Sequence, residues 1–241
     1  MSLRKAHPTF KKGVLFMGEI IIQPETTKDP ISLIGREAGV CWGADITKAK
    51  RNYKRGLDCL AQNHGRTLEF PQIYMTIDGY SAKFARELYT HIAGGPTRVQ
   101  ASTRYINYDD FKVVVPPQIA ARPDAMNAYK KAVNQIRESM VAMKEAGVPN
   151  EDATMILPLA MTTKMVMRTN LRHLIDMAHQ RMCTRAYWEY RDFMRDLCNA
   201  LAAYSEEWSY LVNTYFVPKC EYLGYCPEMK DGCGRKPHKE G

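Results

Sequence analysis

A glycine-rich segment that begins at His91 carries side chains suited to binding an anion. Gly94 and Gly95 follow the histidine, and Arg98 and Arg104 come after them, with serine and threonine hydroxyls between. Backbone N–H groups exposed at a glycine pair, together with arginine side chains, can bind a phosphate or a pyrophosphate. The same residues could also form an ordinary surface loop, so composition alone leaves both interpretations open.

A second group of polar side chains lies in a stretch with helical spacing. Asn170, His173 and Asp176 follow one another at intervals of three, and Arg172 and Arg181 belong to the same stretch. Residues three or four positions apart share one side of a helix, here next to an apolar stripe. This pattern predicts a ligand cavity or a subunit interface beside the helix. The alternative is an exposed face with ion pairs such as Arg172–Asp176, which contribute little to stability.

The end of the chain contains potential metal ligands at irregular spacing. The pattern is Cys220-x5-Cys226-x6-Cys233-x4-His238. Three thiolates and one imidazole could bind zinc. However, the pattern lacks the Cys-x-x-Cys pair that is typical of small zinc sites, and free or locally paired thiols are the alternative. We therefore expect no metal in the tail, while the residue types keep a zinc site open.

Hydrophobic periodicity predicts the elements that must position these groups. Strands are expected at 13–23 and 72–80, where β-favouring residues or strict alternation dominate. Helices are expected at 45–61, from an N-cap at Ser81 to about 92, at 124–145, at 163–182, from a cap at Thr184, and from Ser205 onward.

Length and composition are those of a globular chain. Of its 241 residues, 45% are hydrophobic and 25% are charged, which argues against wholesale disorder and against a polytopic membrane protein. No stretch approaches the roughly 18 uncharged apolar residues of a spanning helix, and the basic N-terminal residues do not resemble a secretory signal. We expect a cytoplasmic α+β protein. One compact domain at 1–217 would contain a central mixed or antiparallel sheet packed with long helices, and a tail would follow at 218–241.

The charge balance favours anionic partners. Lysine and arginine number 34 against 26 aspartates and glutamates, which gives a net charge of +8. Nucleic acid would fit such a charge, but the basic residues are dispersed and suit phosphorylated small molecules equally well. An ordinary basic surface is the third interpretation. The scattered cysteines Cys41, Cys59, Cys183 and Cys198 are expected to be buried, reduced thiols.

Several separated motifs, taken together, resemble the flavin-dependent thymidylate synthases. The signature of this family is Arg-His-Arg, seven residues and then Ser-x-Arg-Tyr, and His91 and the stretch Ser102-Thr103-Arg104-Tyr105 match parts of it. The resemblance covers roughly residues 38–208. Further matches, in the family's order, are His64-Gly65, Phe70, Leu157-Pro158-Leu159, Thr163-Lys164, Asn170-Leu171-Arg172-His173-Leu174, Arg181 and Trp188-Glu189.

The resemblance implies that FAD, methylenetetrahydrofolate and dUMP meet in one site, with NADPH as the reductant and dTMP as the product. It implies that no cysteine adds to the uracil. Arg181 would instead lie along the ring and stabilise the negative charge that develops there. Gln100, Ser102 and Arg104 are assigned to dUMP with Arg181. The residues assigned to FAD are His91, Arg98, Asn170, Arg172 and Asp176.

The sequence departs from the family pattern in and around this signature. Arg-His-Arg is replaced by Thr90-His91-Ile92, and nine residues rather than seven separate it from Ser102. We expect Arg98 to replace one of the missing positive charges. Gln72 and Thr154 stand where the family has a histidine and an arginine. These differences leave open whether the product is methylated or hydroxymethylated.

The resulting prediction is a homotetrameric enzyme that methylates dUMP, without a membrane or a stable nucleic-acid partner. One alternative is a related flavin and folate enzyme that makes a hydroxymethylated uracil product. Another is a basic nucleic-acid-binding relative that has lost catalysis. The presence of Ser102, Arg104 and Arg181 speaks against the second alternative.

Overall fold

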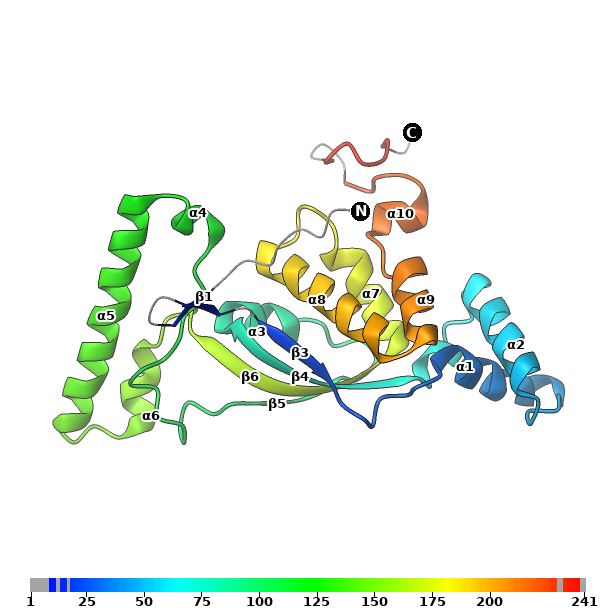
Figure 1. Cartoon of the computed structure of the whole chain (residues 1–241), viewed down its shortest axis with the longest axis horizontal. Helices are drawn as coiled ribbons and strands as arrows, with labels where there is room; N and C mark the ends of the chain where they lie inside the picture. Colours follow the sequence, from blue (N-terminus) through cyan, green and yellow to red (C-terminus); the bar gives the residue numbers. More distant parts are fainter. Residues whose placement is uncertain (1–8, 12–13, 17, 229–231, 239–241) are drawn as a thin grey trace. The chain divides into compact units, whose positions relative to one another are not determined.

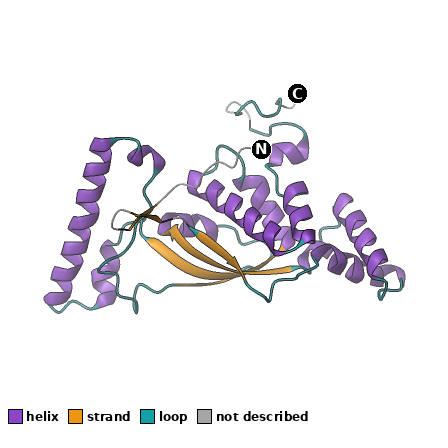
Figure 2. Ribbon diagram, in the orientation of Figure 1, coloured by secondary structure: helices purple, strands orange, loops and turns teal. Residues whose placement is uncertain are grey.

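Four strands form one antiparallel sheet in the computed structural model, which describes residues 9–11, 14–16, 18–228 and 232–238. The strand order is β3 (Glu19–Ile22), β4 (Gln72–Ser81), β6 (Thr162–Asn170) and β5 (Thr97–Gln100). The strands are drawn in orange in Figure 2. A second, two-stranded sheet pairs β1 (Thr9–Lys11) with β2 (Val14–Phe16) in antiparallel register. The predicted α+β class is confirmed.

Strand β6 corrects the sequence-based expectation of one helix at 163–182. Buried Thr163, Met165 and Met167 alternate with exposed residues such as Lys164, which is the period of a strand. A helix, α7 (Leu171–Arg181), begins only after this strand. The prediction failed because residues 167, 171 and 174 are also spaced as on one helix face.

Two other expected elements also differ. The strand predicted at 13–23 is divided between β2 and β3, which belong to different sheets; residues 12, 13 and 17 lie outside the described residues. Thr184 does not cap a helix. Helix α8 (Trp188–Tyr204) instead follows Tyr187, which makes no side-chain cap hydrogen bond.

Contacts within the chain define two units whose segments alternate in the sequence. Unit 1 comprises Met1–Glu19, Ile77–Thr90 and Val99–Met165; unit 2 comprises Ile20–Thr76, His91–Arg98 and Val166–Gly241. Strands β4 and β6 therefore contribute residues to both units. The described residues of the C-terminal segment fall in unit 2, and the boundary expected at 217 stays a prediction.

In unit 1, helix α3 (Ala82–Tyr89) begins as predicted, with the Ser81 hydroxyl accepting a hydrogen bond from the Phe84 N–H over 3.0 Å. The predicted long helix is confirmed as α5 (Pro123–Glu145), and α4 (Pro117–Ala120), α6 (Asn150–Ala153) and the 3-10 turn η3 (Thr154–Ile156) flank it. The apolar stripe of α5 packs into a core cluster made of Tyr108, Phe111, Val113, Val133, Met140 and Met161.

In unit 2, helices α1 (Pro30–Gly39) and α2 (Ala49–Ala61) lie side by side (Figure 1). Their backbones are in close contact at two glycines. A Cβ atom at Gly35 would lie 1.8 Å from the Asn52 carbonyl oxygen, and one at Gly56 would lie 2.0 Å from that of Ile31. Only glycine fits at either position. Helix α1 was not predicted, and α2 begins four residues later than expected. The 3-10 turns η1 (Val40–Trp42) and η2 (Thr67–Glu69) follow these helices.

The remaining helices of unit 2 are α8, α9 (Glu206–Thr214) and α10 (Lys219–Leu223). Ser205 caps α9 as predicted, because its hydroxyl accepts a hydrogen bond from the Trp208 N–H over 3.2 Å. Within the described ranges, every helix is too short or too polar to cross a lipid bilayer.

Candidate active site

Arg181 lies at the end of α7, where two neighbours fix its guanidinium. Its Nε donates a hydrogen bond to Nε2 of His91 over 2.8 Å. The guanidinium carbon also lies 4.7 Å from the centre of the Tyr190 ring, a cation–π contact. His91 follows α3 and Tyr190 is in the first turn of α8. The residue predicted to activate the substrate is thus in direct contact with one predicted to bind the cofactor.

The hydrogen bond from Arg181 requires a neutral His91. Nε2 can accept this bond only if it carries no proton. Burial, followed by the positive charge of Arg181 and, more weakly, that of Arg98, lowers the pKa of His91 to about 4. At neutral pH His91 is therefore uncharged and able to hold the arginine.

A second histidine is buried beside the first. His173 is 2% exposed, and its ring centre lies 6.2 Å from that of His91. Its Nδ1 is 2.5 Å from the Thr169 hydroxyl oxygen. Burial, and then the charge of Arg98, lowers the pKa of His173 to about 4. Its Nε2 is buried without a hydrogen-bond partner among the described residues, which is a costly arrangement that a polar ligand group would relieve.

Asn170 connects the start of α7 to the glycine turn. Its Oδ1 accepts from the His173 N–H over 2.9 Å, and its Nδ2 donates to the Gly94 carbonyl over 3.2 Å. Gly94 has a φ of +73°, and a Cβ there would lie 2.8 Å from Nδ2 of Asn170, so a larger residue does not fit. Arg98 donates from Nη2 to the His91 carbonyl over 2.5 Å. These contacts fasten the 91–98 turn to the N-terminus of α7.

A hollow of about 710 Å³ lies beside α7 within unit 2. Arg172 and Asp176 line it, together with Gly65 and with Tyr222 of α10. Arg172 donates to a carboxylate oxygen of Glu69 over 2.7 Å rather than pairing with Asp176. The volume is within the range of pockets that take small molecules or cofactors. Both residues are thus placed where a ligand could reach them.

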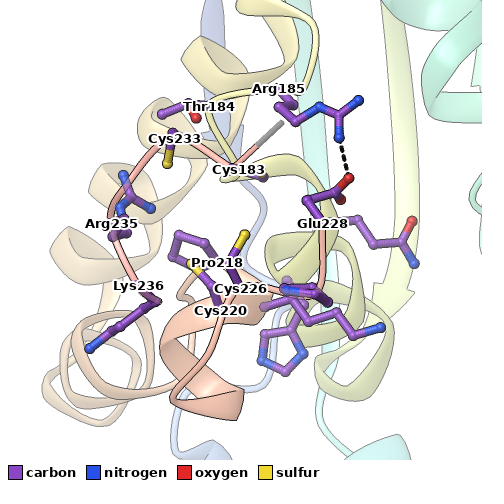
Figure 3. Close-up of a pocket in the computed structure, with 15 residues that line it drawn as sticks. Cys183, Thr184, Arg185, Pro218, Cys220, Cys226, Glu228, Cys233, Arg235 and Lys236 are labelled. Atoms are coloured by element: carbon purple, nitrogen blue, oxygen red, sulfur yellow. Dashed lines mark hydrogen bonds and ion pairs between the residues drawn. The ribbon is translucent and has the colours of Figure 1, made fainter. Parts of the chain in front are cut away.

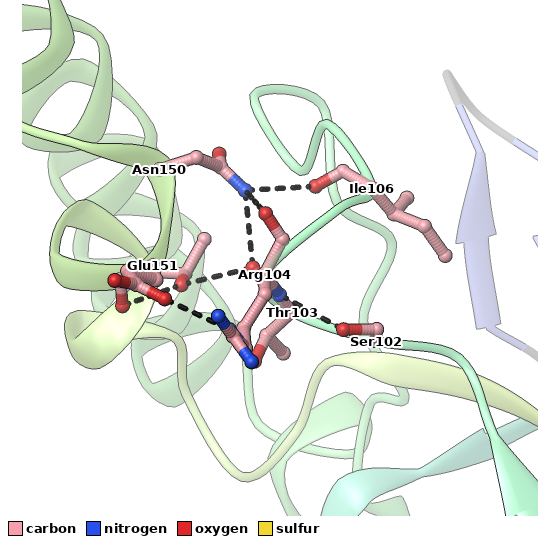
Figure 4. A network of polar contacts seen from close by, with 7 residues as sticks. Ser102, Thr103, Arg104, Ile106, Asn150 and Glu151 are labelled. Atoms are coloured by element: carbon pink, nitrogen blue, oxygen red, sulfur yellow. Dashed lines mark hydrogen bonds and ion pairs between the residues drawn. The ribbon is translucent and has the colours of Figure 1, made fainter.

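In unit 1, one side chain holds the turn that carries the predicted phosphate ligands (Figure 4). The Asn150 Nδ2 donates to the carbonyl oxygens of Thr103, Arg104 and Ile106 over 3.1, 3.0 and 3.3 Å. The Thr154 hydroxyl lies 3.2 Å from the same Thr103 oxygen. Thr154, which stands where the family has arginine, therefore supports the backbone of this turn.

The side chains of the turn are exposed and weakly held. Arg104 donates from Nε to Glu151 over 2.8 Å, and these two side chains are 63% and 51% exposed. Such an exposed ion pair contributes little to stability, so Arg104 can exchange its partner for a phosphate. The Ser102 hydroxyl accepts from the Arg104 N–H over 3.1 Å. Gln100 donates to the Thr163 hydroxyl over 3.1 Å.

The predicted site residues fall into two groups. Within unit 2, contacts connect His91, Arg98, Asn170 and Arg181, while Arg172 and Asp176 line the hollow. The residues of unit 1 are Gln100, Ser102 and Arg104.

Sequence reasoning missed Tyr190, Thr169 and Asn150 as parts of the site. Only Tyr190 had a sequence signal, since it directly follows the Trp188-Glu189 motif.

The cysteines outside the tail only partly match expectation. Cys59 is buried, but Cys41 is exposed, and Cys183 and Cys198 have intermediate exposure. The expectation of burial was therefore wrong for Cys41. None of these thiols forms a disulfide among the described residues.

Comparison with known proteins places the chain in a family. Residues 24–204 match the family described as thymidylate synthase complementing protein. The flavin-dependent thymidylate synthase of Thermococcus onnurineus (strain NA1) is 31% identical over 188 residues, which is 75% of this chain and 76% of the relative. The flavin-dependent thymidylate synthase of Thermococcus kodakarensis is 32% identical over 184 residues, which is 73% of this chain and 74% of the relative.

A solved structure agrees with this assignment. The crystal structure of thymidylate synthase X from Helicobacter pylori with FAD and dUMP has a TM-score of 0.64 and 21% identity, and the match covers 81% of this chain and 97% of that one. The fold is thus that of thymidylate synthase X. The chain belongs to the family of flavin-dependent thymidylate synthases, and it is an enzyme. Helices α9 and α10 lie beyond residues 24–204, the range that the family model matches.

Proposed function

We propose that this enzyme converts dUMP to dTMP, with FAD as cofactor, methylenetetrahydrofolate as the one-carbon donor and NADPH as the reductant. Flavin dependence and the thymidylate product are supported by the names of its relatives. The observation that carries the proposal is the fixed guanidinium of Arg181, held by His91 and Tyr190.

Arg181 supplies a positive charge in a fixed position. His91 holds one edge of its guanidinium and the Tyr190 ring lies against one face, so the side chain cannot turn away. A cation that is already oriented stabilises negative charge as it develops in the pyrimidine ring, typically by about 3 kcal/mol. The neutral state of His91 is part of this function, because a protonated imidazole would repel the arginine.

Residues of unit 2 would bind the FAD. When bound, this cofactor would supply the hydride that reduces the one-carbon unit. Arg172 would pair with an anionic part of the cofactor, and Asp176 on the same wall of the hollow would accept hydrogen bonds from it. The unpartnered Nε2 of His173 and the 91–98 turn with Arg98 provide further polar groups nearby.

Residues of unit 1 would bind the nucleotide. Arg104 would form a charge-assisted pair with the dUMP phosphate, and Ser102 would donate its hydroxyl to the same group. Gln100 would contact the nucleotide from β5. Asn150 orients the turn in advance by its three hydrogen bonds to the backbone.

We also propose a homotetramer in the cytoplasm. The segment that carries the predicted ligands contains apolar side chains that are largely exposed: Ile92 at 76%, Val99 at 70% and Tyr105 at 80%. Further copies of the chain would cover such side chains and complete the site. Free thiols at all seven cysteines suit a reducing compartment. Light scattering of the purified protein measures the assembly, and a monomer would contradict it.

A reconstituted assay tests the proposed reaction. Purified protein is incubated with dUMP, methylenetetrahydrofolate, NADPH and FAD, and the nucleotide product is identified by mass spectrometry. We expect dTMP that depends on each component. A hydroxymethylated product would reassign the reaction. A colourless protein without turnover that binds nucleic acid would support the binding alternative instead.

A further inference from the structure

Four of the seven cysteines line a single hollow in unit 2 (Figure 3). Cys220, Cys226 and Cys233 come from the C-terminal segment, and Cys183 comes from the loop between α7 and α8. The hollow has a volume of about 410 Å³. Cysteines far apart in the sequence are thus gathered at one place, outside the site proposed for dUMP and FAD.

Ordinary core packing does not account for this grouping. A buried cysteine can act as a small apolar residue, and Cys220 is buried. Cys233, however, is exposed, and Cys183 and Cys226 have intermediate exposure. All four are free thiols. Thiols that face one solvent-accessible hollow have the chemistry of soft-metal ligands.

We propose that Cys183, Cys220, Cys226 and Cys233 bind one zinc ion as a structural site. Four cysteine thiolates complete a tetrahedral shell and leave no open position for substrate. Binding releases the four thiol protons, so that Zn²⁺ and four thiolates form a complex with a net charge of −2. No electron is transferred, and no oxidant or reductant is needed.

The charges around the hollow match such a complex. Glu228 is the one carboxylate in the described lining, and it forms an ion pair with Arg185 (Figure 3). The lining contains four basic side chains, Arg185, Lys219, Arg235 and Lys236, of which Lys236 forms an ion pair with Glu221 over 3.0 Å. Lys219 and Arg235 would therefore be the main charges that offset the negative tetrathiolate.

The described part of the chain holds these ligands near one another but not yet at metal distance. No three of its cysteine, histidine, aspartate or glutamate side chains stand close enough together to hold an ion as they are. The tail is nevertheless folded back on itself, because the Cys226 N–H donates to the Pro237 carbonyl over 2.7 Å. Loading therefore requires the thiols at the rim of the hollow to turn inward around the ion.

The proposal departs from the sequence-based expectation of a tail without metal, and it also changes the ligand set that the spacing suggested. Cys183 lines the hollow, whereas His238 does not. His238 lies near Cys226, since atoms of both side chains are within 3.3 Å of the point that a Cβ of Gly232 would occupy. His238 is therefore the competing fourth ligand, which an experiment can separate from Cys183.

A metal here would fasten the tail to α7. The Tyr222 ring of α10 stacks on His179 of α7, with ring centres 4.7 Å apart, and His179 lines both hollows. The ion would thus hold the α10 wall of the hollow proposed for FAD. The inference does not rest on the proposed reaction, because a structural ion can be present whether or not dTMP is made.

Elemental analysis of the purified full-length protein tests the proposal. We expect about one zinc per chain in the unmodified protein and less than about a tenth of that in Cys183→Ser and Cys226→Ser. Cys41→Ser, which removes an exposed thiol outside the hollow, is the matched control and retains the metal. No zinc in the unmodified protein, or equal zinc in all the variants, overturns the proposal.

Two further measurements separate the alternatives. His238→Gln retains zinc if Cys183 is the fourth ligand; loss of zinc in His238→Gln with retention in Cys183→Ser overturns that assignment. The second measurement uses the unmodified protein, so that folding defects of the variants cannot affect the result. A chelator should make four additional thiols reactive toward a thiol reagent, and added zinc should protect them again. A disulfide between two of the four in the unreduced protein would mean a redox pair and not a metal site.

Discussion

The two groups of proposed site residues are held in place by different means. In unit 2, the charged Arg181 is fixed by side chains, the neutral imidazole of His91 and the ring of Tyr190. In unit 1, Arg104 is largely exposed, and the turn around it is fixed through its backbone by Asn150. In unit 2 the charged side chain is therefore fixed. In unit 1 the backbone is fixed, and the charged side chain can move.

This difference matches the two tasks proposed for them. Charge stabilisation during a reaction is strongest where the charge is fixed and partly removed from water. A phosphate that enters and leaves in every cycle needs a cation that can exchange partners, as Arg104 can do with the exposed Glu151. Substitutions in the Arg181 group should therefore reduce turnover, and those near Arg104 should reduce affinity.

The largest effect is expected for Arg181→Lys. Lysine keeps the positive charge but cannot present a planar edge to the uracil while bonding His91. We expect turnover to fall by about 100-fold or more, with the fold and much of the FAD binding retained. Steady-state kinetics of dTMP formation and the flavin absorbance of the protein measure the two parts. Arg122→Lys, a change of an exposed arginine whose guanidinium donates hydrogen bonds to Gln118, is the control. Turnover within about twofold of the parent would show that Arg181 is not the activating residue.

Arg98→Ala should have the next largest effect. If Arg98 replaces a charge of the missing signature arginines, its removal weakens FAD or dUMP binding by about 1–3 kcal/mol. Calorimetric titration of both ligands measures this change. Arg168→Ala is a matched control, because Arg168 lies on the neighbouring strand and contacts Thr97 of the same strand as Arg98. Unchanged affinity for both ligands would leave Arg98 with a structural role only.

Local signals in the sequence predicted much of the fold. Helix α5 and strand β4 have clear periods, and the caps Ser81 and Ser205 act within their own first turn. The prediction was wrong for β6, because the spacing of its residues fits the period of a helix as well as that of a strand. Local pattern alone cannot decide such a segment, since the pairing of β6 with β4 and β5 is a contact between distant segments.

The site was predictable as a set of residue types but not as a set of contacts. The resemblance to the family identified Arg181 and His91, but their hydrogen bond joins residues 90 positions apart. The role of Asn150 depends on backbone carbonyls at least 44 positions away, which no motif contains. Cys183 likewise had no visible relation to the tail cysteines. Contacts of this kind arise only when the chain folds.

Asn150→Ala tests the group of site residues in unit 1, where the turn is held through its backbone. Loss of three hydrogen bonds should loosen the turn and weaken dUMP binding by about tenfold, or about 1.4 kcal/mol, while FAD binding stays unchanged. Titration of each ligand measures the two affinities. Asn213→Ala is the control, because Asn213 donates hydrogen bonds to Ser209 in the same helix and lies outside the proposed site. An equal loss of FAD affinity would mean that the turn supports both ligands, and the proposed separation would be wrong.

The smallest effect that we expect is on the pH dependence of stability. It tests the group of site residues in unit 2, where His173 is buried. The pKa of His173 is about 4 in the folded protein, below its ordinary value of 6.5, because of burial and the charge of Arg98. The unfolded chain therefore takes up this proton first as the pH falls. The stability that neutral His173 provides is complete above pH 6.5 and is lost progressively down to pH 4. Between pH 7 and pH 5.5 this loss amounts to about 1 kcal/mol. His173→Gln tests this argument, because glutamine does not titrate. Between pH 7 and pH 5.5 the free energy of unfolding in urea should therefore decrease by about 1 kcal/mol less for this variant than for the unmodified protein. This difference does not depend on how stable the variant is at pH 7. Parallel pH profiles for the two proteins would show that His173 is not held neutral by its surroundings.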